Sequence, residues 1–122
     1  MIEVKTYTLA NGLRLIHHKD ATTRMVALNL LYKVGARNEN PEKTGYAHLF
    51  EHLMFSGSAN AESYDEPLQA AGGESNAWTS NDVTNYYDIV PAHNVETAFW
   101  LESDRLLQLS LTEKKFEAQK SV

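Results

Sequence analysis

Three ionisable residues that could act together, His48, Glu51 and His52, fall in one short stretch of the sequence. If this stretch is helical, His48 and His52 stand one turn apart on the same face, and Glu51 lies at the edge of that face. Burying two imidazoles and a carboxylate among apolar neighbours is costly unless each group is paired or binds a metal. A zinc ion held by the two imidazole nitrogens would supply that compensation.

A metal at this position would support hydrolysis. Zinc lowers the pKa of a water molecule to about 7, and Glu51 is suitably placed to act as the general base. The expected reaction is metal-assisted hydrolysis, with a peptide bond as the favoured substrate. The alternative is a structural role, because histidine pairs at this spacing also occur by chance in helices. The order His-x-x-Glu-His, which is typical of inverted zincins, favours the metal site.

The element expected to carry these residues is a helix over 46–55. Thr44 is a plausible N-cap and Gly57 a plausible stop signal. Apart from the three ionisable residues, the stretch is apolar or aromatic. We therefore expect a helix that is buried nearly all round.

The apolar runs, turn signals and helix caps in the rest of the sequence predict an α+β fold, with a mostly antiparallel sheet and helices packed on it. Asn11-Gly12 is a strong hairpin signal, and the apolar run from Met25 to Val34 resembles a strand covered on both faces. Further helices are expected to begin at Ser63, Asn94 and Thr112. The expected strands cover 4–9, 13–18, 25–34, 74–82 and 84–90.

Composition narrows the class of protein. The chain has 122 residues, a net charge of -5 and no cysteine, so we expect one domain without a disulfide framework or thiolate metal site. The acidic balance argues against nucleic acid as a partner, and no apolar run is long enough for a membrane span. No signal peptide is visible, so the expected location is cytoplasmic, or periplasmic if the chain begins after a removed signal.

The C-terminal segment lacks a helix stop signal. The helix expected from Thr112 continues to Val122 without a terminating glycine or proline. The chain is therefore expected to be truncated at its C-terminus, with 1–122 forming the N-terminal portion of one domain.

Several motifs together carry a family resemblance. The sequence resembles the N-terminal part of the pitrilysin (insulinase) family of zinc peptidases, the inverzincins. A member of bacterial type is expected. This resemblance implies the fold given above, Zn²⁺ as the cofactor and zinc-dependent endopeptidase activity. The matching segments are Thr8–Leu13, Val34–Arg37, Gly45–His52, Gly72-Gly73, Asn76–Thr79 and Thr84–Tyr87.

The resemblance also implies roles for the three ionisable residues. His48 and His52 correspond to zinc ligands, and Glu51 corresponds to the base that activates water. The third ligand of the family, a glutamate, is expected a few residues beyond Val122 and so not in this chain.

The last helix carries other polar residues that bear on the ligand set. Glu113 and Glu117 come too early to match the third ligand and are expected to face the surface. Gln119 stands where the family has a further carboxylate, a departure that is either neutral or weakens the surroundings of the metal.

The family's substrate-binding edge strand matches Asn76, Ala77, Trp78 and Thr79. The resemblance implies that a peptide or unfolded polypeptide binds there by strand addition, through main-chain hydrogen bonds. We expect Asn76 and Ala77 to contribute their backbone groups. Without the resemblance, this segment is a polar strand that follows a Gly-Gly turn.

Active members of the family close the cleft with a second, homologous domain or partner chain. The 122-residue chain alone is therefore expected to bind zinc weakly and to have little activity. An alternative function is a non-catalytic structural or partner subunit of the same fold, although such members usually lose part of the motif that is intact here. A third interpretation gives the metal a purely stabilising role.

Overall fold

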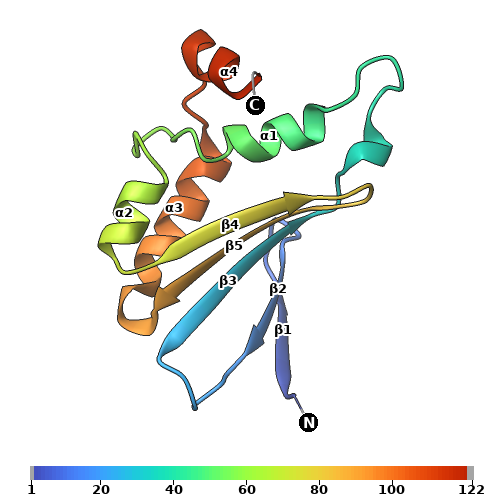
Figure 1. Cartoon of the computed structure of the whole chain (residues 1–122). Helices are drawn as coiled ribbons and strands as arrows, with labels where there is room; N and C mark the ends of the chain where they lie inside the picture. The colour runs from blue at the N-terminus through green and yellow to red at the C-terminus, as the bar shows by residue number, and fades with distance from the viewer. Residues whose placement is uncertain (1, 121–122) are drawn as a thin grey trace.

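The structure, a computed structural model that describes residues 2–120, combines antiparallel strands with four α-helices (Figure 1). This arrangement confirms the predicted α+β class. In chain order the elements are β1 Val4–Thr8, β2 Arg14–His18, β3 Met25–Tyr32, the 3₁₀ turn η1 Ala36–Asn38, α1 Tyr46–Leu53, α2 Asp65–Ala70, β4 Glu74–Thr79, β5 Thr84–Pro91, the 3₁₀ turn η2 Ala92–Asn94, α3 Val95–Leu107 and α4 Glu113–Lys120.

The main sheet has three antiparallel strands in the order β3-β5-β4. The central strand, β5, is largely buried, whereas β4 forms one edge of the sheet. Helices α1, α2 and α3 lie over one face of this sheet, with α1 near the end of β4 (Figure 1). The fold therefore brings α1 and an open sheet edge together.

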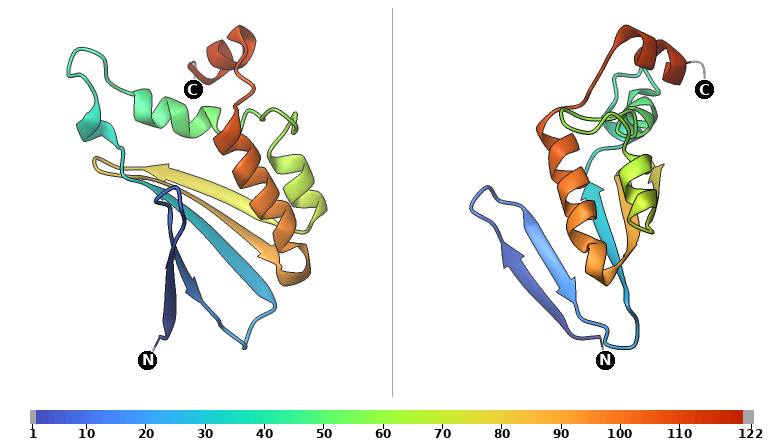
Figure 2. Two further views of the ribbon diagram at one scale, coloured as in Figure 1. Left: turned by 180° about the vertical axis from the view of Figure 1, so that it is seen from behind. Right: turned by 90° about the vertical axis from the view of Figure 1, so that its left-hand side faces the viewer.

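The first two strands form the predicted hairpin. β1 and β2 pair antiparallel with Val4 opposite His18 and Thr8 opposite Arg14. Gly12 adopts a positive φ of 86°, and the Asn11 side chain accepts a hydrogen bond from the Leu13 amide at 3.0 Å. The hairpin stands apart from the three-stranded sheet, on the side away from α1 (Figure 2).

The prediction that Met25–Val34 forms a strand covered on both faces is wrong. β3 ends at Tyr32, and its side chains alternate between exposed and half-buried along the whole strand. The reason is its position, because β3 is an edge strand with helices over one face only. Its apolar composition indicated the strand correctly but not its surroundings.

The core lies between the sheet and the helices. Tyr64, Leu68, Val90, Ala98 and Leu101 are fully or almost fully buried there. No helix within residues 2–120 has the length and apolar content needed to cross a membrane.

A charged pair extends this core. Arg105 and Glu102, both on α3, form a buried ion pair with nitrogen and oxygen 2.5 Å apart. The guanidinium group of Arg105 also stacks over aromatic rings, with its carbon 4.7 Å from the centre of the Tyr86 ring and 5.4 Å from that of Phe55. Burial of such a pair is tolerated because each charge has a partner.

The helix boundaries follow local hydrogen bonds, with two departures from expectation. Ser63 accepts a hydrogen bond from the Glu66 amide, as predicted, but α2 begins only at Asp65. Asn94 precedes α3, as predicted, yet its side chain donates to the carbonyl of Ala71 and does not cap the helix. Thr112 accepts a hydrogen bond from the third residue of α4, as a cap does.

Candidate metal centre

The start of α1 is held by a carboxylate from an earlier loop. Gly45 precedes the helix with a φ of 93°. The two carboxylate oxygens of Glu39 accept hydrogen bonds from the amides of Gly45 and Ala47, each at 2.7 Å. These amide donors, that of Ala47 first, lower the pKa of Glu39. The prediction that Thr44 caps this helix is therefore wrong. The carboxylate of Glu39 accepts hydrogen bonds from amides at the start of the helix instead.

Only one side of α1 is buried. Leu53 is inaccessible, whereas Tyr46 and Phe50 remain 49% and 51% exposed. The expectation of a helix buried nearly all round is therefore wrong. α1 packs against the sheet on one side, and its aromatic side lines an open apolar cavity of about 540 Å³ that also touches Tyr32.

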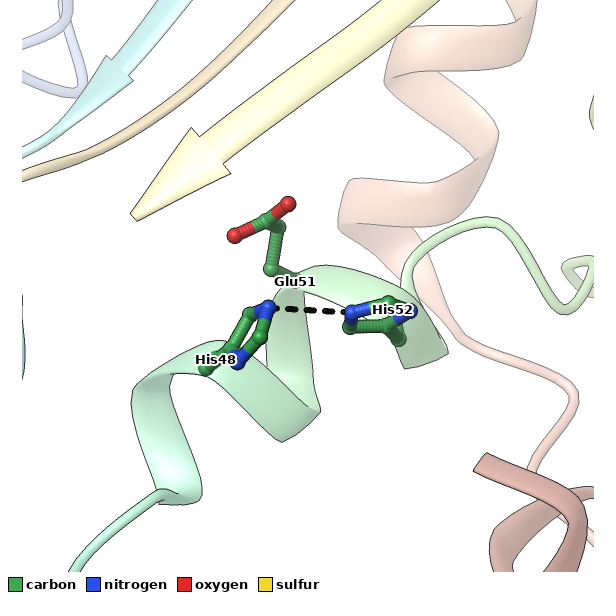
Figure 3. A group of neighbouring side chains, drawn as sticks. All are labelled: His48, Glu51 and His52. Carbon is green, nitrogen blue, oxygen red and sulfur yellow. Dashed lines mark hydrogen bonds between the residues drawn. The ribbon is translucent and has the colours of Figure 1, made fainter. Parts of the chain in front are cut away.

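His48 and His52 face each other across one helical turn (Figure 3). Their Nε2 atoms are 3.1 Å apart, and their ring centres are 4.7 Å apart. His48 is exposed and His52 half-buried. The predicted spacing thus brings both imidazole nitrogens to one point beside α1.

The geometry of this pair suits a zinc ion. Two nitrogens that each lie about 2.0 to 2.1 Å from a tetrahedral zinc ion are roughly 3.3 Å from one another, close to the separation observed here. One donor atom from each of His48, Glu51 and His52 lies within 4.8 Å of the others. Imidazole nitrogen and carboxylate oxygen are both ligands that zinc accepts.

Glu51 points away from the histidine pair, toward the end of β4 (Figure 3). There its Oε2 accepts a hydrogen bond from the hydroxyl of Thr79. His48, Glu51 and Thr79 line the same cleft of about 460 Å³, together with Ala36, Ala77, Trp78, Ser80 and Asn81. The cleft therefore joins the histidine face of α1 to the predicted substrate strand.

The backbone directions along β4 decide which amides are available at the sheet edge. Ser80 donates its amide proton to Val83 in the adjoining turn. Because backbone groups alternate in direction along a strand, the amides of Asn76 and Trp78 point toward β5. The amides of Ala77 and Thr79 point outward, away from the sheet.

The side chain of Asn76 has a contact that the sequence did not indicate. Its Oδ1 accepts a hydrogen bond from the outward amide of Ala77 at 2.8 Å. Trp78 is 46% exposed, and because side chains alternate along a strand, it projects from the sheet face opposite to that of Thr79. The substrate-binding role of the segment Asn76–Thr79 remains a prediction. The expected backbone contribution of Asn76 does not fit the direction of its amide, which points toward β5, so Ala77 and Thr79 are the members with outward amides.

The turn that follows β4 is locked to the loop after β3. The amides of Ala36 and Arg37 donate to the carbonyls of Ser80 and Asn81 at 3.1 and 2.8 Å. A side chain at Gly35 would place its Cβ 2.4 Å from the Ser80 carbonyl oxygen. Both this glycine and Glu39 support the site. Gly35 lies in the matching segment Val34–Arg37, but sequence reasoning gave it no role in positioning the site and did not consider Glu39.

α4 packs beside α1 and borders the histidines. His48, His52 and Gln119 line a groove of about 630 Å³ between the two helices. Within residues 2–120, Glu113 and Glu117 do not join the group formed by His48, Glu51 and His52. The third ligand, predicted beyond Val122, lies outside the described residues.

Comparisons with known proteins agree with one another. The family model described as Insulinase (Peptidase family M16) matches residues 14–122. The zinc protease PqqE of Helicobacter pylori is 35% identical over 121 residues, which is 97% of this chain and 27% of that protein.

Two solved structures are also similar. A protease from Helicobacter pylori superposes with a TM-score of 0.92 and 33% identity, covering 99% of this chain and 30% of the other. Pitrilysin gives a TM-score of 0.87 at 25% identity, covering 98% of this chain and 13% of the other. The chain thus spans less than a third of each of these relatives.

Proposed function

Because this chain belongs to the insulinase family, peptidase family M16, we propose that it forms part of a zinc-dependent endopeptidase. His48 and His52 bind the zinc ion, and Glu51 is the general base. The proposal depends on one observation above all, that one possible ligand atom from each of these three side chains of α1 lies within 4.8 Å of the others.

Different residues of this chain have different roles in peptide hydrolysis. When bound, zinc supplies Lewis acidity that brings the pKa of a water molecule to about 7. Glu51 takes a proton from the attacking water and passes it to the nitrogen of the leaving amine. Its carboxylate faces the cleft that the end of β4 also lines, so the proton moves beside the strand where the substrate binds.

The substrate is a peptide or an unfolded polypeptide in extended form. It pairs with the open edge of β4, where Ala77 and Thr79 present outward amides. Main-chain pairing of this kind gives affinity with little dependence on side chains. Such an edge suits a peptidase that accepts varied sequences.

Full activity requires more protein than the chain contains. The chain spans 27% of PqqE and 30% of the similar Helicobacter pylori structure, and its cleft is open to solvent. A second homologous domain or a partner chain closes the cleft, and a further glutamate completes the zinc site. We therefore expect weak zinc binding and little activity from the 122 residues alone.

The test compares zinc content and cleavage of an unstructured peptide in this chain and in the parent protein extended to the length of its relatives. The extended wild type should hold about one zinc ion and cleave the peptide. The Glu51→Gln variant should keep the zinc and lose the activity, because the amide cannot accept the proton from water.

One outcome would contradict the peptidase function, and another would contradict only the role of Glu51. An extended protein that binds zinc but cleaves nothing in a varied peptide set is the result expected of a non-catalytic partner subunit. A Glu51→Gln variant that retains full activity would remove Glu51 from its role as base.

A further inference from the structure

Thr79 connects two parts of the site that lie on different elements. It is the last residue of β4, and its backbone amide points outward at the open edge of the sheet. Its side chain projects from the face of the sheet toward α1, where the hydroxyl donates a hydrogen bond to Oε2 of Glu51. One residue thus touches both the proposed base and the proposed substrate edge.

This hydrogen bond fixes the direction of the Glu51 side chain. Among the described residues, Thr79 is the one side chain that donates a hydrogen bond to Glu51. Rotation about the side-chain bonds of a glutamate is otherwise limited only by packing, and Glu51 is half-buried. A hydrogen bond to a carboxylate is stronger than one between neutral groups, so this contact is well suited to hold the carboxylate in one orientation.

β4 has other contacts that hold it in the fold. β4 pairs along its whole length with β5, and the Ser75 hydroxyl attaches the other end of the strand to Asp65 of α2 at 3.1 Å. The turn after Thr79 is held separately by the amides of Ala36 and Arg37.

We propose that Thr79 is a positioning residue that aligns the Glu51 carboxylate with the substrate backbone at the edge of β4. This inference rests on the proposed peptidase function and deepens it. A peptide paired with β4 sits against the same residue that orients the base. The strand therefore sets the position of the scissile bond relative to the carboxylate, in addition to supplying affinity.

The expected effect of losing the hydroxyl falls on turnover. Misplacement of a catalytic group by about 1 Å can cost on the order of 100-fold in rate. Thr79→Val keeps the shape and β-branching of the side chain, so the strand should persist. We expect kcat to fall roughly 10- to 100-fold, while KM changes less than about 2-fold because main-chain pairing is intact.

The experiment uses the extended parent protein with three variants. Thr79→Val removes the hydroxyl, Thr79→Ser keeps it, and Ser75→Ala removes the hydroxyl at the other end of the same strand face. Steady-state kcat and KM on an unstructured peptide, zinc content and a crystal structure of each variant are compared. The expected result is loss of kcat in Thr79→Val alone, unchanged zinc content, and a reoriented Glu51 carboxylate in its crystal structure.

Other results would overturn the inference. It fails if Thr79→Val turns over like the wild type, if Thr79→Ser loses as much kcat as Thr79→Val, or if the loss is confined to KM. If Thr79→Val does not fold, Thr79→Ala supplies the same comparison with a smaller side chain.

The test separates this inference from the function on which it rests. If the wild-type parent protein cleaves nothing, the proposed peptidase function is contradicted. In that case the crystal structures still test the role of Thr79. If the Glu51 carboxylate has not moved in Thr79→Val, the positioning role of Thr79 is overturned; a displaced carboxylate supports that role.

Discussion

The guanidinium carbon of Arg105 lies 4.1 Å from the centre of the Tyr64 ring, which places a cation over an aromatic face inside the core. Two further rings and the carboxylate of Glu102 complete its surroundings. Tyr64 in turn donates a hydrogen bond to Asp88 at 2.8 Å. A polar network therefore runs through the core from α3 to β5.

Replacing Arg105 by methionine should destabilise the chain strongly. The substitution leaves Glu102 buried without its partner, and breaking a buried ion pair costs about 3 to 5 kcal/mol. The measurement is the free energy of unfolding from chemical denaturation. Arg37→Met is the matched control, because the ion pair of Arg37 with Asp82 is exposed and should contribute less than about 1 kcal/mol. Equal losses in the two variants would contradict the prediction.

Asp88 should make the chain less stable as the pH rises from about 4 to about 6. Burial raises the pKa of Asp88 from 3.8 to about 6, so the folded state holds the proton more tightly than the unfolded state. Stability is greatest below the unfolded value and is lost as the pH passes through the folded value. The shift corresponds to about 3 kcal/mol.

The measurement for Asp88 is the free energy of unfolding as a function of pH, for the wild type and for Asp88→Asn. Asparagine keeps an acceptor for Tyr64 but does not ionise, so this part of the pH dependence should disappear. Parallel curves for the two proteins between pH 4 and 7 would show that Asp88 does not titrate as expected.

Glu39→Gln should loosen the first turn of α1. The lowered pKa of Glu39 means that its ionised form is favoured in the folded state, so its contribution is present above the unfolded value of 4.5 and is lost as the pH falls through the folded value. At pH 7 we expect faster amide hydrogen exchange at the start of α1 in Glu39→Gln. Glu42→Gln, a neighbouring exposed position, is the control and should leave this exchange unchanged.

Zinc should raise the melting temperature of this chain through the histidine pair. A ligand present at a hundred times its dissociation constant stabilises a protein by about 2.7 kcal/mol. The shift, measured by thermal denaturation with and without zinc, should disappear in His52→Gln. His93→Gln is the control, since His93 is exposed in η2, away from the site. A full zinc shift in His52→Gln would place the metal elsewhere.

The features that were predictable from sequence depend on local spacing. The hairpin follows from Asn11-Gly12, and the approach of His48 to His52 follows from the pitch of a helix. The Thr79 contact with Glu51 was not predictable, because it joins residues 28 positions apart and depends on how α1 packs on the sheet. The burial of β3 and α1 was misjudged because composition does not show how many faces of an element are covered.

The hydrogen bond between the Asn76 side chain and the outward amide of Ala77 has a consequence for self-association. An edge strand with free amides can pair with the same edge of another copy of the chain. Asn76 occupies one of these amides from its own strand, so a second copy would have to displace an internal hydrogen bond before it could pair there. An incoming peptide faces the same barrier, and only strands that offer enough main-chain partners to replace that bond gain a stable place at the edge.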